Sequence, residues 1–265
     1  ELSESGNKVL LCYGGGSIKK AGIYDEAVKI LKEEDIEIFE LSGIAPNPKI
    51  ESVREGVKLC KENDIDMVLA IGGGSVIDCA KVVAAGACYD GDPWDLVITP
   101  RWIKKALPIY SVLTLSATGS EMDPFAVISD MSKNEKWGTS SEHMKPKMSI
   151  LDPEYTYSVS KKQTAAGTAD MISHICENYF TNVKNADVQA RFAEGLLKNC
   201  FKYGPIALEE PDNYDARANL MWTASMAING ILSDGAEVSW CVHPMEHELS
   251  AFYDITHGEG LAILT

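Results

Sequence analysis

The chain alternates short apolar runs with longer segments whose apolar side chains recur at helical spacing. A strand inside a parallel sheet is apolar along its whole length, because helices cover both faces of the sheet. The clearest run of this kind lies at residues 67–71, and further strand-like runs lie at residues 8–13, 37–41, 109–115 and 148–151. Segments with helical character lie between them, at residues 24–34, 50–60 and 75–88. This order predicts strands joined by crossover helices, and therefore an α/β fold with a doubly wound, Rossmann-like parallel sheet.

Beyond residue 153 the pattern changes to helices alone. Three long segments have helical character, at residues 164–180, 186–203 and 214–233. We therefore predict an α/β dinucleotide-binding domain over residues 1–156 and an all-α metal-binding and catalytic domain over residues 157–265. Because pockets favour domain interfaces and the carboxyl ends of parallel strands, we expect the cleft between these two domains.

Composition narrows the classes of partner. The 265 residues include 39 acidic and 24 basic side chains, and the net charge of −15 repels nucleic-acid phosphates and anionic lipids. Seven cysteines are scattered without a Cys-x-x-Cys pair, which is typical of free thiols in a reducing compartment. No apolar run approaches the ~20 residues that span a bilayer, and the first residues do not resemble a signal peptide. We expect a cytoplasmic protein that binds neither nucleic acid nor membranes.

Two of the predicted strands end in glycine turns that could hold a phosphate. The stretch GGGSVIDCAK, residues 72–81, leads from a strand into a helix that Ser75 is expected to cap. Backbone N–H groups at such a turn bind anions without basic side chains, although the spacing matches neither G-x-G-x-x-G nor a P-loop. YGGGSIKK, residues 13–20, is a second such turn, and the two could grip one dinucleotide. Plain tight turns are the alternative interpretation of both motifs.

Two further features bear on the identity of that dinucleotide. Glycine, with Ser17, Lys19 and Lys20 nearby, stands where an NAD-binding protein carries an acidic residue, and this favours the 2′-phosphate of NADP. The stretch TLSATGSE, residues 114–121, adds hydroxyl groups beyond the end of a strand, although a capped helix start would explain them equally well. The sequence therefore favours NADP(H) over NAD(H).

A carboxylate and a histidine share one face of a predicted helix. Asp170 and His174 lie four residues apart in TAAGTADMISHICE, so both side chains project from one face and can reach a common ion. A hydrogen-bonded pair at the protein surface is an equally good interpretation of this spacing taken alone, because such pairs are common on helices.

Most of the imidazole groups concentrate near the end of the chain. His243 and His247 repeat the four-residue spacing, and His257 directly precedes Gly258, where the absent side chain would leave room for a ligand. With His174, these residues make up four of the five histidines. One carboxylate with imidazoles and no thiolate suits Fe²⁺, Zn²⁺ or another divalent first-row metal.

In this order, the two glycine turns, TGSE, D-x-x-x-H and H-x-x-x-H-x9-H resemble the iron-containing alcohol dehydrogenase family. The chain is most similar to its butanol dehydrogenase branch, which includes NADPH-dependent aldehyde reductases. The segments that carry this similarity are YGGGSIKKAGIYDEA, GGGSVIDCAK, TLSATGSEMD, NYDARANLMW and HPMEHELSAFYDITHGEGLAIL. Family members begin earlier and continue beyond the final LAILT, so we expect the helical domain to be incomplete at its C-terminal end.

The resemblance implies roles for individual residues. It implies that the metal ligands are Asp170, His174, His243 and His257. It also implies that His247 is a catalytic residue near the substrate and not a ligand. The dinucleotide is expected against both glycine turns, the hydroxyl-rich stretch and one lysine. The residues concerned are Gly14, Gly15, Gly16, Ser17, Gly73, Gly74, Ser75, Asp78, Thr114, Thr118, Ser120 and Lys136.

The activity that the resemblance implies is reversible hydride transfer between NADP(H) or NAD(H) and a small aliphatic aldehyde such as butanal. Fe²⁺, or else Zn²⁺ or another divalent metal, would act as a Lewis acid on the carbonyl oxygen, and His247 would deliver a proton to it. A homodimer is expected. The rival interpretations are a zinc enzyme of the glycerol-dehydrogenase or dehydroquinate-synthase type, a metal-dependent hydrolase, and an incomplete fragment that binds the cofactor without catalysis.

Overall fold

Parallel strands form one open sheet in the computed structural model, which describes residues 2–238 and 240–265. In the described part of the chain, the order across this sheet is β2 (Glu37–Leu41), β1 (Lys8–Tyr13), β3 (Met67–Gly72), β4 (Ile109–Leu113) and β7 (Met148–Ile150). Each neighbouring pair runs parallel. The predicted α/β fold with a doubly wound, Rossmann-like sheet is therefore confirmed.

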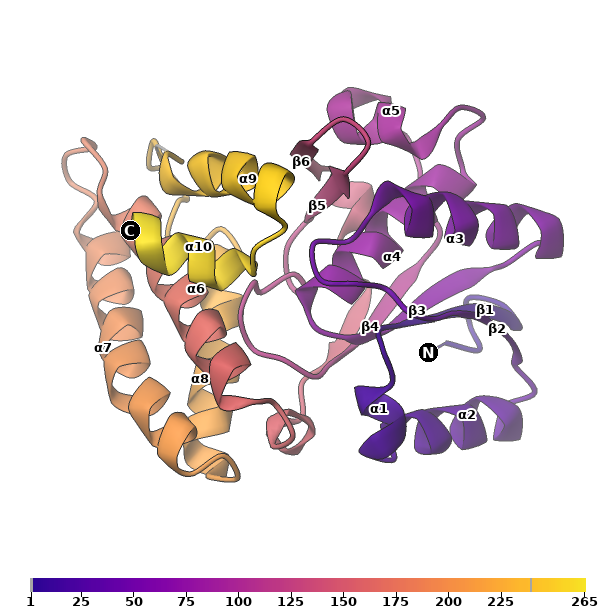
Figure 1. Cartoon of the computed structure of the whole chain (residues 1–265), viewed down its shortest axis with the longest axis horizontal. Coiled ribbons are helices and arrows are strands. Elements are labelled where there is room, and N and C mark those ends of the chain that lie inside the picture. Colours follow the sequence, from indigo (N-terminus) through magenta and orange to yellow (C-terminus); the bar gives the residue numbers. More distant parts are fainter. Residues whose placement is uncertain (1, 239) are drawn as a thin grey trace. The chain divides into compact units, whose positions relative to one another are not determined.

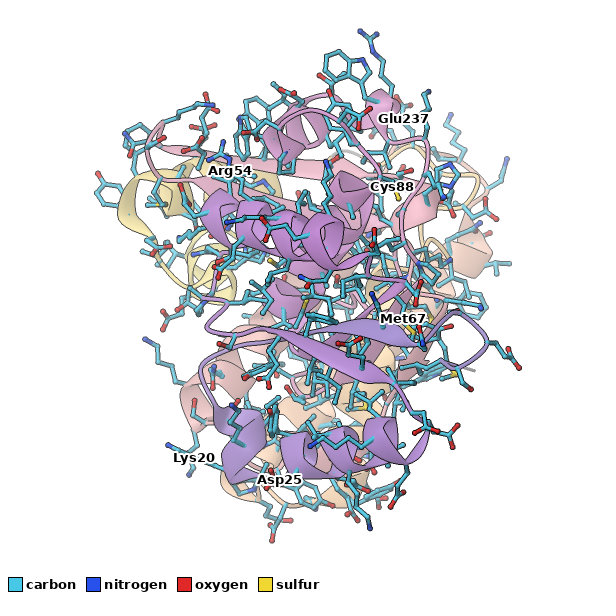
Figure 2. The ribbon with its side chains drawn as sticks, turned by 90° about the vertical axis from the view of Figure 1, so that its right-hand side faces the viewer. Lys20, Asp25, Arg54, Met67, Cys88 and Glu237 are labelled. Atoms are coloured by element: carbon cyan, nitrogen blue, oxygen red, sulfur yellow. The ribbon has the colours of Figure 1, made fainter. Side chains whose placement is uncertain are left out.

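Helices cover both faces of this sheet, which explains the apolar character of its central strands. One face carries α1 (Ser17–Lys20) and α2 (Ile23–Glu33), and the other carries α3 (Ile50–Asn63) and α4 (Gly74–Ala87), with α5 (Pro93–Ile98) packed against both of these (Figure 1). Figure 2 shows the strand with Met67 between the helices with Lys20 and Asp25 and the helix with Arg54. Every residue of β3 is buried, whereas the edge strand β2 is fully buried only at Leu41. Burial therefore follows coverage on two faces.

The helix that follows β3 starts earlier than the sequence predicts. α4 begins at Gly74, its N-cap is Gly73, and no side chain caps it. The expectation that Ser75 caps this helix is wrong, because Ser75 already lies within the first turn, and an N-cap residue must precede the helical residues. The backbone N–H groups of Val76 and Ile77 donate to the Gly73 carbonyl oxygen instead.

An antiparallel hairpin of β5 (Phe125–Asp130) and β6 (Glu135–Ser140) belongs to the sheet-containing half and is absent from the sequence-based expectations. Two side chains of α4 hold it. Asp78 Oδ2 accepts a hydrogen bond from the Val127 N–H at 2.9 Å, and Lys81 Nζ donates to the Phe125 carbonyl oxygen at 2.7 Å. These contacts join positions 49 and 44 residues apart, so no local pattern could reveal them.

The rest of the fold is mainly helical. Its longer helices are α6 (Lys161–Tyr179), α7 (Asp187–Glu209), α8 (Tyr214–Ile228), α9 (Val242–Tyr253) and α10 (His257–Leu264), and it includes the short 3-10 helix η3 (Pro153–Thr156). The 3-10 helices η1 (Pro100–Trp102) and η2 (Glu142–Met144) belong to the sheet-containing half. α6 contacts α7, α8 and α10, as Figure 1 shows. Met171, Ile175, Cys200 and Leu220 are fully buried among these helices. The packing makes α6 the central element of this half.

Two of these helices end at positions that the sequence did not predict. α7 continues through Pro205 to Glu209, because Ile206 and Ala207 still pack against the helical core and offset the hydrogen bond that proline removes. α8 ends at Ile228, where Gly230 adopts a φ of +101° that other residues rarely take.

Contacts divide the described residues into two compact units. The first unit comprises the chain up to Leu113 together with Pro124–Ile150, and the second comprises Thr114–Asp123 and Leu151–Thr265. The stretch Thr114–Asp123 therefore packs with the helices, although it follows a strand of the sheet. The domain limits at residues 156 and 157 stay a prediction. Within the described residues, each helix is too short or too polar to cross a membrane.

Candidate metal centre and cofactor-binding residues

Helix α6 presents Asp170 and His174 on one face. Ser160 starts this helix as its N-cap by accepting a hydrogen bond from the Gln163 N–H, and one helical turn separates the two candidate ligands. Asp170 is 2% exposed and His174 is 6% exposed, so the pair is buried and not a surface contact. His174 Nδ1 lies 3.5 Å from Asp170 Oδ1.

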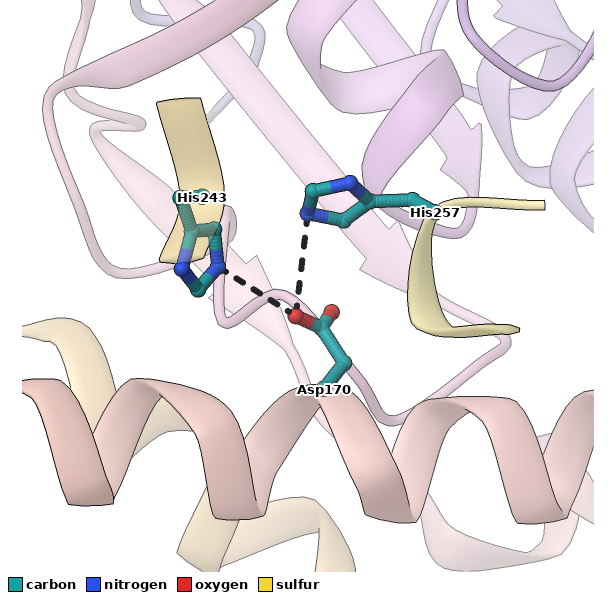
Figure 3. Close-up of side chains that lie close together, drawn as sticks. All are labelled: Asp170, His243 and His257. Atoms are coloured by element: carbon teal, nitrogen blue, oxygen red, sulfur yellow. Dashed lines mark ion pairs between the residues drawn. The ribbon is translucent and has the colours of Figure 1, made fainter. Parts of the chain in front are cut away.

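Helices α9 and α10 bring two more imidazoles to the same carboxylate. His243 Nε2 lies 3.7 Å from Asp170 Oδ1, and His257 Nε2 lies 3.8 Å from it, from the other side (Figure 3). The His243 ring also stacks on the His174 ring, with 4.4 Å between centroids. One carboxylate oxygen thus faces imidazoles from three helices, although up to 87 residues separate these positions in the sequence.

The unpaired polar atoms of this cluster show that it fits a cation. Among the described residues, Asp170 Oδ1, His174 Nδ1 and His243 Nε2 are buried without a hydrogen-bond partner. Leaving such atoms unpaired costs about 1–3 kcal/mol each, and more for a charged group. The ligand atoms of Asp170, His243 and His257 all lie within 4.8 Å of one another, as donors around one divalent ion must. His174 lies beside this trio, with its nearer nitrogen toward Asp170.

Electrostatics favours a cation at the same place. Burial works against the charge on Asp170, but the nearby histidines, His174 foremost, outweigh it and hold the pKa of Asp170 below its ordinary value. Burial prevails at His174 and lowers its pKa to about 4. Burial also opposes the charge on His243, but the carboxylates of Asp170 and Glu177 outweigh it and raise that pKa to about 9. Near neutral pH a bound cation would therefore displace the proton of His243.

Two glutamates that the sequence analysis missed form hydrogen bonds with the imidazole nitrogens that face away from Asp170. Glu177 forms a hydrogen bond with His243 Nδ1, and Glu246 forms one with His257 Nδ1. Glu177 had a sequence signal, because it follows Asp170 by seven residues and therefore lies on the same face of α6. Glu246 had none, because its pairing with His257 depends on how α9 and α10 pack.

His247, the candidate catalytic residue, adjoins this cluster. Its ring centroid lies 5.7 Å from that of His257 and 6.5 Å from that of His243. A nitrogen of His247 also lies within 4.8 Å of ligand atoms of Glu246 and His257. His247 is half-buried.

Glycines let backbone segments lie directly on α6. A Cβ atom at Gly258 would stand 2.1 Å from the Ala166 carbonyl oxygen, so Gly258 lets α10 approach α6 closely. The sequence interpretation that Gly258 leaves room for a ligand is therefore replaced by a packing role. A Cβ atom at Gly167 would stand 2.5 Å from the Ser116 carbonyl oxygen, which places the stretch Thr114–Asp123 against the same helix.

The two glycine turns lie at the carboxyl ends of two neighbouring strands. They follow β1 and β3, which run parallel and pair with each other as far as Tyr13 and Ile71. Gly16 adopts a φ of +108°, which only glycine takes readily. The residues of these turns, all in the first unit, are Gly14, Gly15, Gly16, Ser17, Gly73, Gly74 and Ser75.

The remaining cofactor candidates are divided between the two units. Lys136 belongs to the first unit, where its buried Nζ donates to Asn47 Oδ1 at 3.0 Å, and Asp78 binds the β5 backbone. In the second unit, the backbone N–H of Ser120 donates to Thr118 Oγ1 at 3.2 Å, and Thr114 begins the same stretch.

The chain is similar to known proteins along its whole length. Residues 1–153 match the family described as iron-containing alcohol dehydrogenase, and residues 164–265 match the C-terminal part of the Fe-containing alcohol dehydrogenase family. The NADH-dependent butanol dehydrogenase A of Clostridium acetobutylicum is 61% identical over 265 residues, which cover 100% of this chain and 68% of that protein. The NADPH-dependent aldehyde reductase YqhD of Escherichia coli is 44% identical over 260 residues, which cover 97% of this chain and 67% of that protein.

A solved structure has the same fold. The crystal structure of NADH-dependent butanol dehydrogenase A from Thermotoga maritima superposes with a TM-score of 0.94 at 48% sequence identity, covering 96% of this chain and 64% of that one. The present chain thus spans about two thirds of the length of the proteins it matches.

We expect Zn²⁺ to raise the melting temperature of the unaltered protein and to leave that of Asp170→Ala unchanged. A cation that binds only the folded protein stabilises it by about 2.7 kcal/mol at roughly a hundred times its Kd. Thermal unfolding of metal-free protein, with and without added Zn²⁺, measures the effect. Asp187→Ala, which removes an exposed carboxylate of the same unit, is the control and should keep the full shift. An undiminished shift in Asp170→Ala would exclude this cluster as the metal site.

Proposed function

Because the chain belongs to the iron-containing alcohol dehydrogenase family, we propose that it is a metal-dependent alcohol dehydrogenase or aldehyde reductase. The proposed reaction is reversible hydride transfer between NAD(P)(H) and a small aliphatic aldehyde such as butanal. The observation that carries the proposal is the buried Oδ1 atom of Asp170, which has no hydrogen-bond partner among the described residues and faces three imidazoles. Relatives named as butanol dehydrogenases and as an aldehyde reductase support the substrate class.

Four residues would hold the metal in this proposal. Asp170, His174, His243 and His257 supply one carboxylate and three imidazoles, a donor set that suits Fe²⁺ and also accepts Zn²⁺ or another divalent metal. A divalent metal bound here supplies Lewis acidity, which polarises a carbonyl oxygen and stabilises the charge that develops on it. We propose Fe²⁺ as the resident ion, in keeping with the family.

Backbone groups would capture most of the dinucleotide. The turns at Gly14–Ser17 and Gly73–Ser75 present N–H groups beyond two adjacent strands, which suits a pyrophosphate on a chain whose net charge is −15. Thr114, Thr118 and Ser120 are proposed to add hydroxyl groups that bind the cofactor. Asp78 would act by holding the hairpin, and Lys136 would act from its buried position beside Asn47.

The preference for NADP(H) stays a prediction. It rests on Ser17, Lys19 and Lys20, which lie near the first glycine turn. Lys19 Nζ lies over the rings of Tyr13 and Tyr24, at 4.9 and 4.3 Å from their centroids, so its charge is already engaged. Lys20 is exposed and is the basic side chain that we propose for a 2′-phosphate.

His247 is proposed to deliver the proton to the carbonyl oxygen, directly or through water or ribose hydroxyls. Its half-buried ring beside His257 supports this assignment. An imidazole can give up and regain a proton near neutral pH, as a reversible reaction of this kind requires.

We also propose that the protein is cytoplasmic and acts as a homodimer. All seven cysteines are free thiols. Five of them are buried or half-buried: Cys12, Cys60, Cys79, Cys176 and Cys200. Thiols in this state suit a reducing compartment. The homodimer rests on the family resemblance.

We expect the metal-loaded protein to oxidise NADPH or NADH when butanal is added, and chelation to lower the rate by about 10² or more. Loss of the reduced nicotinamide absorbance measures the rate, and Fe²⁺ or Zn²⁺ added back should restore it. Full activity after verified removal of the metal would contradict the metal-dependent mechanism. Binding of dinucleotide without turnover in any metal-loaded sample would instead favour the incomplete cofactor-binding fragment.

The cofactor preference has its own test. We expect kcat/KM to be higher with NADPH than with NADH, and Lys20→Ala to lower the NADPH value by roughly five- to tenfold, which corresponds to about 1 kcal/mol for an exposed charge contact. The NADH value should not change. Lys29→Ala on α2, which removes an exposed lysine of the same unit, is the matched control. Higher kcat/KM with NADH in the unaltered protein would show that the predicted preference is wrong.

Replacing His247 tests its role as the proton donor. We expect His247→Ala to lower kcat by about 10²-fold, to flatten the pH dependence of kcat, and to leave the metal content unchanged. Steady-state rates across pH, together with metal analysis, measure these effects. His143→Ala, in the short 3-10 helix η2, removes a histidine of the other unit as the control. Full activity of His247→Ala at every pH would reduce His247 to a packing residue.

A further inference from the structure

Resting on the proposed metal-dependent function, we propose that Glu177 and Glu246 are positioning residues for the two imidazoles that α9 and α10 supply. Each carboxylate holds the Nδ1 atom of one ring, His243 or His257, and so leaves the Nε2 atom of that ring to face Asp170. We further infer that an amide cannot replace Glu177.

The surroundings of Glu177 allow it only to accept hydrogen bonds. Its Oε1 atom accepts from the backbone N–H groups of Cys241 and Val242, each at 2.6 Å. Its Oε2 atom faces the N–H of His243 at 3.4 Å and bonds to Nδ1 of the same residue. Backbone N–H groups can never accept a hydrogen bond. Both oxygens are therefore committed to donors, and the imidazole proton must lie on Nδ1.

The same contacts make Glu177 the link between α6 and the start of α9. Its carboxylate meets three consecutive N–H groups, of Cys241, Val242 and His243, at the N-terminus of a 12-residue helix. A carboxylate at this place satisfies donors that the helix itself leaves unpaired and interacts favourably with the helix dipole. Glu177 therefore positions both the backbone that carries His243 and the ring of His243.

Glu246 supports the imidazole of His257. One of its oxygens bonds to His257 Nδ1, and the other accepts from the hydroxyl of Ser250. The Ser250 hydroxyl also lies 3.3 Å from the Ile255 carbonyl oxygen, in the segment that leads into α10. Glu246 is therefore bonded within α9 and to the first residue of α10.

Glutamine at position 177 would therefore change the tautomer of His243. In Glu177→Gln, the amide oxygen must face the two backbone N–H groups, which leaves the NH₂ group toward His243 Nδ1. His243 must then accept at Nδ1 and carry its proton on Nε2, where that proton blocks metal ligation.

The test measures the affinity of the full chain for Zn²⁺, by competition with a fluorescent zinc chelator at fixed pH. Removing a partner of this kind typically lowers metal affinity by about 10–100-fold, and we expect Glu177→Gln and Glu246→Ala to fall in that range. Co²⁺ spectra of the loaded proteins report the ligand field, and should change in Glu177→Gln. Glu177→Ala additionally removes the bonds to α9, so its metal-free form should melt below that of Glu177→Gln.

Control variants separate this proposal from the proposed function. Glu194→Gln makes the same change of charge in the same unit, on a carboxylate bonded to Tyr179 and Arg191, and should keep the full affinity. Zn²⁺ affinity of Glu177→Gln or Glu246→Ala within twofold of the unaltered protein would overturn the positioning role of that residue. Failure of the unaltered protein to bind Zn²⁺ more tightly than Asp170→Ala would instead contradict the metal site and the proposed function.

Discussion

A buried ionised carboxylate among imidazoles is the constraint on which the site depends. Asp170 is almost wholly buried, and its Oδ1 atom has no hydrogen-bond partner among the described residues. A buried charge is tolerated only when other charges or donors compensate it. The proton on His243 compensates it in part, and a divalent cation would do so more fully. A cation at the proposed site would therefore offset the cost of burying Asp170.

The framework around Asp170 is made from backbone contacts on one helix. Gly167 and Gly258 let the stretch Thr114–Asp123 and helix α10 lie directly against α6, with no side chain between them. The carboxylate of Glu177 accepts hydrogen bonds from backbone N–H groups at the start of α9. Backbone contacts of this kind leave little freedom for the elements to slide, because close-packed interiors do not deform continuously. Ligands from three helices can therefore keep a common geometry.

This acidic chain compensates buried charge and could bind anions in two different ways. At the proposed metal site, the buried carboxylates of Asp170, Glu177 and Glu246 each face one or more imidazoles. The glycine turns offer N–H groups in place of basic side chains, so an anionic phosphate could bind despite a net charge of −15. Lys19, a basic side chain near the first turn, forms cation–π contacts with two tyrosine rings.

The sequence by itself determined the sheet, because strands covered on two faces must be apolar throughout, as in β3. It also determined that Asp170 and His174 share a face, since helical periodicity is a local property. Only the tertiary structure decided which distant groups meet. The β5–β6 hairpin, the contact of Gly258 with Ala166 and the pairing of Glu246 with His257 all join separate elements. Local pattern carries no signal for such contacts, because packing between elements creates them.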